Sequence, residues 1–430
     1  MGRVTLVTNL VAALALASGA ARAQSPKPLY GASTVSYGPS AVTATAGTVS
    51  DARSGYVVAA VADSVGNLEV TAWQDTTKKL AAVGKPYDAS GTPIVAVAAA
   101  DLDSNQVVTA DVDQLGKLSV RTWTVGTAGI APLNSYTSSP DTANILGSTP
   151  FLGIAALSAT QVVTAVQDSN GDLIVQAWNI PSGGEPVRYG PAWNGGAVDE
   201  IAIAALDSAT FMTATNDPSQ DLKVTTWGVD GLDSLGVYPQ DQYIEHKVVG
   251  DLTPRVAIAA GTVETFNATQ SPPDKISRYA VTPISNRDEV IEVLYWQISS
   301  SGVISKIGDK VGSATETALC TAAAMLPSAV PISVYCDFPA PGYHDWGIDV
   351  GWYGHTGETE LTEVTGEHAA VQSVSAAPAG DSFKISDPYA AVSAYFVTGA
   401  LTSTGLPPSV GNPGEFQLQL WSYPITLPVL

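Results

Sequence analysis

The chain has 430 residues, of which 45% are hydrophobic and only 14% are charged, and its formal net charge is −21. This composition excludes an intrinsically disordered protein, which would have fewer apolar and more charged residues. Lys and Arg total 19 against 40 Asp and Glu, so binding of nucleic acid through clustered basic residues is also excluded. Two cysteines are too few for a disulfide framework or a four-cysteine zinc site.

The first 23 residues have the features of a secretory signal peptide. A positive start is followed by an apolar stretch, and Ala21 and Ala23 supply the small residues that cleavage requires. We expect residues 1–23 to be removed and residues 24–430 to form a single domain. No later stretch has the roughly 20 consecutive apolar residues of a transmembrane helix, and no Cys follows the apolar stretch. The expected location is therefore secreted or periplasmic, without membrane insertion or a lipoprotein anchor.

One pattern recurs along the chain: an apolar residue, any residue, Val or Leu, two further residues and then Trp. Six copies end in Trp and one ends in Tyr: Leu68-x-Val70-x-x-Trp73, Leu118-x-Val120-x-x-Trp123, Leu173-x-Val175-x-x-Trp178, Leu222-x-Val224-x-x-Trp227, Ile291-x-Val293-x-x-Trp296, Ile348-x-Val350-x-x-Tyr353 and Phe416-x-Leu418-x-x-Trp421. Consecutive copies end 49 to 69 residues apart, and six of the nine tryptophans occupy the last position. Such self-similarity is typical of repeat architectures.

Each unit contains four short stretches with strand character, separated by turn residues. In the second unit, Ile94–Ala100 and Gln106–Ala110 precede the motif, and a fourth stretch after it ends near Tyr136. No window has a convincing helical period. Four strands in about 50 residues predict an all-β, seven-bladed β-propeller with four-stranded blades, each of which buries its two faces against its neighbours. The repeated Trp is expected to pack between blades.

The two ends of the chain are expected to meet. The chain ends inside the strand that carries Trp421, so the seventh unit lacks its fourth strand. A strand at about residues 34–39 resembles the fourth strand of the third unit, around Tyr189. We expect this N-terminal strand to pair into the last blade and close the ring, which removes an open sheet edge.

The repeated Gly-x-Leu-x-Val-x-x-Trp pattern resembles secreted bacterial propeller repeats of unassigned function. More distantly, the architecture is similar to lectin-type and integrin-type propellers. The resemblance spans nearly all of the chain after the first 23 residues. It concerns scaffold positions only, so it implies a fold and carries over no catalytic residue.

The two cysteines are expected on neighbouring strands of the sixth unit. Cys320 and Cys336 are each eight positions from the centre of the intervening turn, near residue 328. They would face each other across an antiparallel pair at a separation compatible with a disulfide. In an oxidising compartment we expect them to be bonded. Two buried free thiols are the alternative.

An Asp recurs at the expected turn between the second and third strands of a unit. The copies are Asp63, Asp113, Asp168 and Asp217. The favoured interpretation is that each Asp caps its own turn by accepting backbone N–H groups. The alternative is calcium binding, which needs several oxygen ligands. Only Asp168, Asn170 and Asp172 place three oxygens at alternate positions, so this loop is the one candidate calcium site, and no other cofactor is expected.

In this strand order, the turns between second and third strands share one face with the loops between blades, and we call it the top face. Exposed aromatic residues beside hydrogen-bonding groups on that face are candidates for stacking on sugar rings. The candidates lie in the loop from blade three to blade four, in the loop from blade four to blade five, and in the turn of blade six: respectively Trp193; His246; and Tyr343, His344, Asp345 and Trp346. The alternative is that the aromatic residues simply cover blade edges.

Signals for an enzyme are weak. The chain has four histidines and lacks the His-Glu-x-x-His, Gly-x-Ser-x-Gly and glycine-rich phosphate motifs. We therefore expect a non-catalytic binding module that recognises a glycan or an extracellular protein through the top face, in an undefined oligomeric state. The alternative is a hydrolase or lyase that uses top-face acids and His344. A structural surface protein without a small ligand is a third possibility.

Overall fold

The computed structural model describes the following residues: 27–28, 35–36, 43–52, 56–63, 65–75, 80–89, 91–103, 105–137, 151–182, 185–230, 236–246, 249, 256–265, 275–288, 290–311, 318–326, 330–337, 346–350, 363–366, 370–379, 392–403 and 414–425. In strands β1 to β3 and β25 to β29 it describes the backbone. The described residues form strands and turns with no helix, which confirms the predicted all-β class. Accordingly, this part of the chain contains no helix with the length and hydropathy needed to cross a membrane.

Five sheets have four antiparallel strands each, and in every one the strands lie side by side in chain order. We call these sheets blades two to six. Their strands are β7 (Ile94–Asp103), β8 (Gln106–Asp113), β9 (Leu118–Gly126) and β10 (Gly129–Thr137); β11 (Leu152–Ser158), β12 (Gln161–Gln167), β13 (Asp172–Asn179) and β14 (Val187–Ala197); β15 (Glu200–Ala205), β16 (Thr210–Asn216), β17 (Leu222–Val229) and β18 (Val237–Glu245); β19 (Ala259–Thr265), β20 (Lys275–Ser285), β21 (Ile291–Ile298) and β22 (Ile304–Val311); β23 (Ala318–Leu326), β24 (Val330–Asp337), β25 (Trp346–Val350) and β26 (Glu363–Gly366).

The sixth sheet has nine strands and contains both ends of the described chain. Four of them form blade one: β3 (Thr43–Ala52), β4 (Tyr56–Asp63), β5 (Leu68–Asp75) and β6 (Leu80–Ala89). The others are β27 (Ala370–Ala379), β28 (Val392–Ser403), β29 (Gly414–Ile425), β1 (Lys27–Pro28) and β2 (Val35–Ser36). Both β1 and β2 pair with β29, where Val35 lies opposite Leu418. The strand expected at about residues 34–39 therefore pairs with the strand that carries Trp421, whereas the count of seven blades and the closure of the ring stay predictions.

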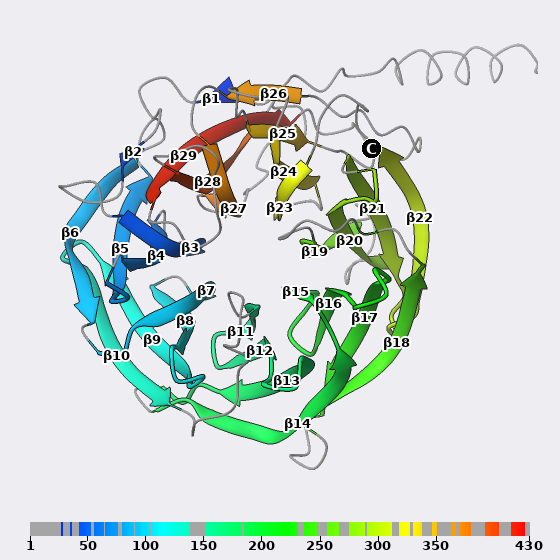
Figure 1. Cartoon of the computed structure of the whole chain (residues 1–430), viewed down its shortest axis with the longest axis horizontal. Coiled ribbons are helices and arrows are strands. Elements are labelled where there is room, and N and C mark those ends of the chain that lie inside the picture. Colours follow the sequence, from blue (N-terminus) through cyan, green and yellow to red (C-terminus); the bar gives the residue numbers. More distant parts are fainter. Residues whose placement is uncertain are drawn as a thin grey trace, which may run out of the picture.

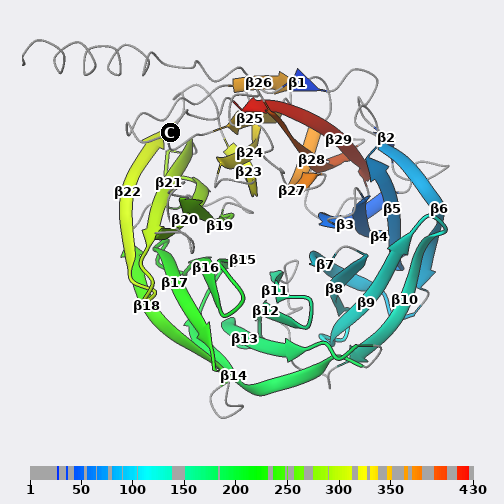
Figure 2. The ribbon, with the colours of Figure 1, turned by 180° about the vertical axis from the view of Figure 1, so that it is seen from behind.

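The sheets are arranged radially (Figure 1), and the view from behind shows the same ring (Figure 2). The first strand of each blade lies nearest the centre, and the fourth strands β6, β10, β14, β18 and β22 form the outer rim. Four-stranded sheets placed around a common axis define a β-propeller. Small residues allow the first strands to approach closely, since a Cβ at Gly153 would collide with the side chain of Ile203 on the next blade.

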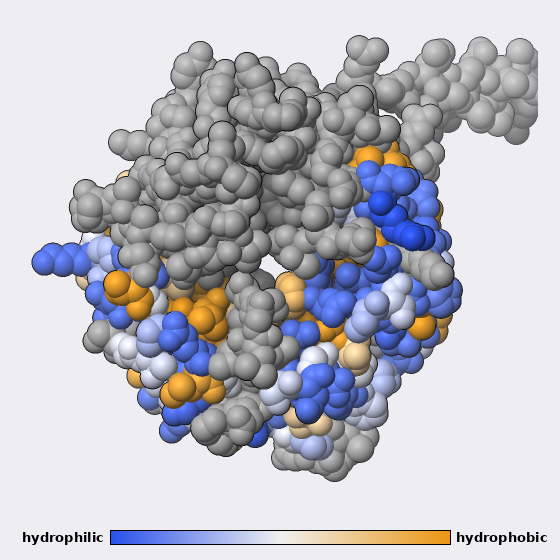
Figure 3. All heavy atoms as spheres, viewed as in Figure 1, coloured by the Kyte–Doolittle hydropathy of each residue, from blue (hydrophilic) through white to orange (hydrophobic). Residues whose placement is uncertain are grey.

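Blades one to five bury both of their faces, to which alternate residues of each strand point. One face of β17 contributes Leu222 and Val224 to a core shared with blade five, and the other contributes Trp227 to a core shared with blade three. The repeated tryptophans of blades two to five are at most 2% exposed. These observations confirm that the motif marks the third strand and that its Trp packs between blades. The face seen in Figure 3 carries mixed polar and apolar side chains over its described part.

The register of blade six agrees with the expected position of the cysteines. Cys320 lies on β23 directly opposite Cys336 on β24. The backbone therefore aligns the two residues as the sequence predicted. The disulfide itself stays a prediction, because their side chains lie outside the described part of the structure.

Candidate functional site

An aromatic side chain on the outer strand of one blade contacts the repeated Trp of the next blade. The ring centroids lie 5.1 Å apart for Tyr87 and Trp123, 5.0 Å for Tyr136 and Trp178, and 5.0 Å for Tyr243 and Trp296. Each of these tyrosines lies opposite the Val of the motif in its own blade. The outer strands thus complete a repeated aromatic contact at the rim, which the sequence motif alone did not reveal.

In blade three, Trp193 occupies this rim position. It lies opposite Val175 within β14, and its ring centroid is 6.4 Å from that of Trp227 on blade four. The prediction that Trp193 lies in the loop between blades three and four is therefore wrong. Tyr189, the other aromatic residue of this strand, lies opposite Ala177 and donates its hydroxyl to the carbonyl of Asp230.

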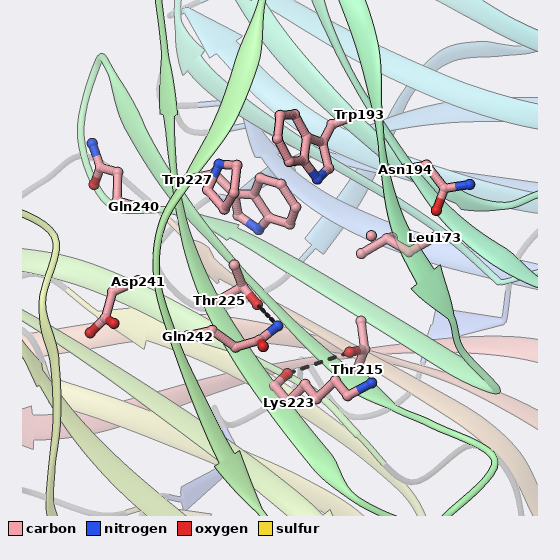
Figure 4. A pocket seen from close by; sticks show the side chains of 12 residues that line it. Leu173, Trp193, Asn194, Thr215, Lys223, Thr225, Trp227, Gln240, Asp241 and Gln242 are labelled. Carbon is pink, nitrogen blue, oxygen red and sulfur yellow. Dashed lines mark hydrogen bonds between the residues drawn. The ribbon is translucent and has the colours of Figure 1, made fainter.

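A cavity of about 350 Å³ lies between blades three and four at this wider aromatic pair. Its walls come from β13, β14, β16, β17 and β18 (Figure 4). The lining residues are Leu173, Trp193, Asn194, Gly195, Thr215, Lys223, Thr225, Trp227, Pro239, Gln240, Asp241 and Gln242. Trp193 is 41% exposed whereas Trp227 is 2% exposed, so the accessible aromatic surface belongs to Trp193.

The cavity opens here because one repeat position holds a small residue. The residue two positions before the motif Trp points toward the preceding blade, and it is Arg121, Gln176, Thr225 and Leu294 in blades two to five. Arg121 fills its interface and lies 2.6 Å from the buried carboxylate of Asp111. Burial raises the pKa of Asp111 in spite of this partner. Gln176 turns to the outer strand and donates to backbone carbonyls, and Thr225 leaves space that the longer side chains occupy.

Among the residues that the structure describes, no cation lies over the aromatic pair at the rim of this interface. Between blades two and three, the guanidinium of Arg188 lies 5.5 Å from the ring centre of Tyr136 and 5.7 Å from that of Trp178. Arg188 lies opposite Trp178 in the register of its own blade. The equivalent partner of Trp227 in blade four is Pro239, which is uncharged and short. The aromatic surface of Trp193 therefore stays accessible.

Polar side chains form the part of the cavity away from Trp193 (Figure 4). The amide nitrogen of Gln242 donates to Oγ1 of Thr225 over 3.3 Å, and Oγ1 of Thr215 donates to the carbonyl of Lys223 over 3.5 Å. Nζ of Lys223 lies 2.9 Å from Oδ2 of Asp217. The cavity therefore combines an aromatic wall with donors and acceptors whose positions are fixed by two packed blades.

The recurring Asp at the turns caps those turns as predicted. In each of the four copies Oδ1 accepts the backbone N–H groups two and four residues further on; these residues are Asp63, Asp113, Asp168 and Asp217. Asn286 makes the same two bonds in blade five. The recurring Asp of the sequence pattern does not include this copy because the residue is an amide.

The candidate calcium loop uses its oxygens within the protein. Asp168 accepts the N–H groups of Asn170 and Asp172, and Nδ2 of Asn170 donates to Oδ2 of Asp168 over 3.2 Å. Oδ2 of Asp172 accepts Nδ2 of Asn194 over 2.9 Å. The described residues contain no group of three or more His, Cys, Asp or Glu that could hold a metal ion. Calcium at this loop stays a prediction.

The other candidate ligand-binding residues are not part of the cavity. His246 directly follows β18, is exposed, and places Nδ1 2.8 Å from Oδ2 of Asp221 at the top face. Trp346 begins β25 instead of lying in the preceding turn, so that prediction is wrong. Tyr343, His344 and Asp345 lie outside the described residues. Trp193 is therefore the one predicted residue that lines the cavity described above.

No protein family model matches the chain, and no curated protein matches it by sequence. Three solved structures illustrate its structural likeness. The WD40 domain of coronin from Toxoplasma gondii is 9% identical, with a TM-score of 0.49 over 93% of this chain and 88% of that one. SapL1 lectin in complex with alpha methyl fucoside is 15% identical, with a TM-score of 0.43 over 76% and 97%. A putative 6-phosphogluconolactonase from Bacteroides fragilis is 12% identical, with a TM-score of 0.46 over 74% and 82%.

Proposed function

We propose that this protein is a secreted, non-catalytic binding module that recognises a glycan. One observation carries the proposal: an accessible tryptophan, Trp193, stands beside hydrogen-bonding side chains in a cavity between two rigid blades. Ligand sites commonly combine an apolar wall with a few placed polar groups. A tryptophan supplies a large, stiff apolar surface for such contacts. A protein partner that inserts one side chain is the competing occupant.

A closed ring of seven blades is part of the proposal. Contacts between successive first strands support it: β3, β7, β11, β15, β19, β23 and β27 contact one another in this order, and β27 contacts β3. Strands β27 to β29 with β2 would then make the seventh blade. Removal of residues 24–40 should expose the edge of β29 and promote aggregation. Removal of residues 24–26 keeps β1 and β2 and serves as the control; equal stability and solubility of the two truncated proteins would contradict closure by these strands.

Binding is tested with a glycan array, probed with the protein that begins at Gln24. Specific binding to a small set of glycans is the expected result. The array is run with calcium and with a chelator. Loss of the signal on chelation would support a metal ion at the loop of Asp168, and an unchanged signal would leave this Asp as a turn cap. No binding on the array in either condition would overturn glycan recognition.

Secretion has its own test. The full chain is produced in a bacterial host, and the protein is recovered from outside the cytoplasm. N-terminal sequencing should begin at Gln24. A product that keeps Met1 and stays in the cytoplasm would contradict the signal peptide.

A further inference from the structure

The geometry points to a single neutral hexose ring as the occupant of the cavity between blades three and four, with Trp193 as its stacking surface and Thr225 as the residue that keeps the cavity open. This inference rests on the proposed glycan recognition and names its site and ligand class. Where blades two to five meet their preceding blades, Thr225 is the short side chain at this position, and blade one also has a Thr there, Thr71. The neighbouring interfaces carry Arg121, Gln176 and Leu294 there.

Size limits the ligand. The cavity volume of about 350 Å³ lies at the lower end of the roughly 300–1,000 Å³ that small-molecule sites span. It suits one sugar ring with its substituents and not a chain of rings. Further rings of a glycan would lie outside the blade interface, over the rim formed by β14 and β18.

The distribution of polar groups matches the two sides of a sugar ring. A pyranose has an apolar surface of C–H groups and an edge of hydroxyl groups. Trp193 and Leu173 supply an apolar wall. Thr215, Thr225 and Gln242 supply hydroxyl and amide groups that both donate and accept. A hydroxyl edge needs such two-way partners, and these groups keep donor or acceptor capacity beyond the bonds from Gln242 to Thr225 and from Thr215 to the carbonyl of Lys223.

Charge favours a neutral sugar over an acidic or basic one. The cavity is lined by one cation, Lys223, and one carboxylate, Asp241. Lys223 is paired with Asp217 over 2.9 Å, and Oδ2 of Asp241 accepts the N–H of Ile304 over 2.8 Å. Both charges therefore have partners within the protein. The net charge of −21 further disfavours an acidic ligand.

The experiment measures binding of single sugars to the protein that begins at Gln24 by titration calorimetry. The probes are methyl glycosides of glucose, galactose, mannose and fucose, with methyl glucuronide as the charged comparison. The test variants are Thr225→Leu, which copies blade five, and Trp193→Ala. Thr225→Ser keeps the short side chain and the hydroxyl. Tyr87→Ala removes the equivalent rim aromatic from an interface that Arg121 fills.

At least one neutral glycoside should bind, and Thr225→Leu and Trp193→Ala should each weaken it at least tenfold. Tyr87→Ala should stay within twofold of the unchanged protein, and Thr225→Ser, which keeps the hydroxyl, should bind more tightly than Thr225→Leu. Circular dichroism and melting temperature identify any variant that fails to fold. If Trp193→Ala fails to fold, the comparison of Thr225→Leu with Thr225→Ser still tests the proposal. Unchanged binding by Thr225→Leu would overturn this site while glycan recognition stands. Preference for the glucuronide would overturn the neutral ligand. Binding to no sugar here and none on the array would overturn both proposals.

Discussion

The indole nitrogen of Trp178 donates a hydrogen bond to Oγ1 of Thr164 over 2.9 Å, and both side chains are fully buried. The same bond recurs three times at 2.9 to 3.0 Å: Trp123 to Thr109, Trp227 to Thr213 and Trp296 to Thr282. A buried indole N–H without an acceptor costs free energy. The Thr on the second strand and the Trp on the third strand therefore form one repeated unit of the fold.

Replacing Thr164 with Val should lower the free energy of unfolding by about 1–3 kcal/mol, because the N–H of Trp178 loses its acceptor while the shape is kept. In a Trp178→Phe background the donor is gone, so Thr164→Val should cost less. Urea unfolding of the four proteins gives the coupling energy between the two sites. Equal effects of Thr164→Val in both backgrounds would show that the hydrogen bond contributes nothing.

Backbone conformation at the capped turns gives a second prediction. Gly171 has φ of +85°, and a Cβ added there would make an ordinary contact of 3.9 Å with Nε2 of Gln167. Gln220 takes the same turn position in blade four with φ of +65°. Gly171→Ala should lower the free energy of unfolding by about 1 kcal/mol. Gln220→Gly should raise it by about 0.5 kcal/mol, because the relief of backbone strain exceeds the added chain entropy of glycine. Urea unfolding measures the change in unfolding free energy for both variants. Changes of the same sign would contradict the prediction.

Stability should depend on pH through Glu69. Burial is the largest cause that raises the pKa of Glu69, and the negative charges of Asp88 and Asp63 raise it further. Asp88 lies directly opposite Glu69 on β6. The folded protein therefore holds this proton more tightly than the unfolded chain. The stability that Glu69 contributes falls as the pH rises from about 4.3, the ordinary value, through the raised pKa.

Glu69→Gln carries no such proton, so its stability relative to the unchanged protein should increase between pH 4 and pH 7. Urea unfolding at both pH values measures the difference. The exposed Glu185, changed to Gln, controls for the loss of one negative charge. If the difference in unfolding free energy between Glu69→Gln and the unchanged protein is the same at both pH values, the raised pKa of Glu69 does not contribute to stability.

The facing backbone positions of Cys320 and Cys336 give the fourth prediction. The intact chain from an oxidising compartment should lack two thiol hydrogens by mass spectrometry and regain them on reduction. The double change of Cys320 and Cys336 to Ser should lower the free energy of unfolding by about 3 kcal/mol under oxidising conditions. Under reducing conditions the two proteins should differ much less. Thiols that react with an alkylating agent in the folded, unreduced protein would exclude the bond.

The strands could be predicted because one local pattern marks each third strand. The motif ending at Trp123 lies in β9, and the one ending at Trp178 lies in β13, in their expected places. The Asp caps followed from residue type and spacing alone. Both features depend on interactions within a few residues or on simple alternation, which a sequence records directly.

The rim position of Trp193 could not be predicted in the same way. Gly190, Pro191 and the glycine pair at Gly195 are turn signals, yet β14 continues through them. An outer strand tolerates Pro and irregular register because one of its edges is unpaired, and β14 shifts register twice against β13. These shifts bring Trp193, and not Tyr189, opposite Val175.

The cavity depends on two blades, so no single stretch of sequence records it. The sequence nevertheless contains an indication of the cavity. Aligning the motif copies of blades one to five on their Trp shows Thr71, Arg121, Gln176, Thr225 and Leu294 at one position, and Thr225, one of the two short residues in this set, lies at the open interface. The sequence could not show which face of the strand this position takes or what the neighbouring blade places against it.

The aromatic contacts at the rim give each blade two different sides. Blade two offers Trp123 to the blade before it and Tyr136 to the blade after it. The interface between successive blades is therefore heterologous: it resembles a head-to-tail contact between subunits, which closes into a ring by rotation. A duplicated blade carries both sides of this interface and fits between any two existing blades. Such a chain can lengthen by whole blades without a new interface, while the residue at the position of Thr225 is free to differ from copy to copy.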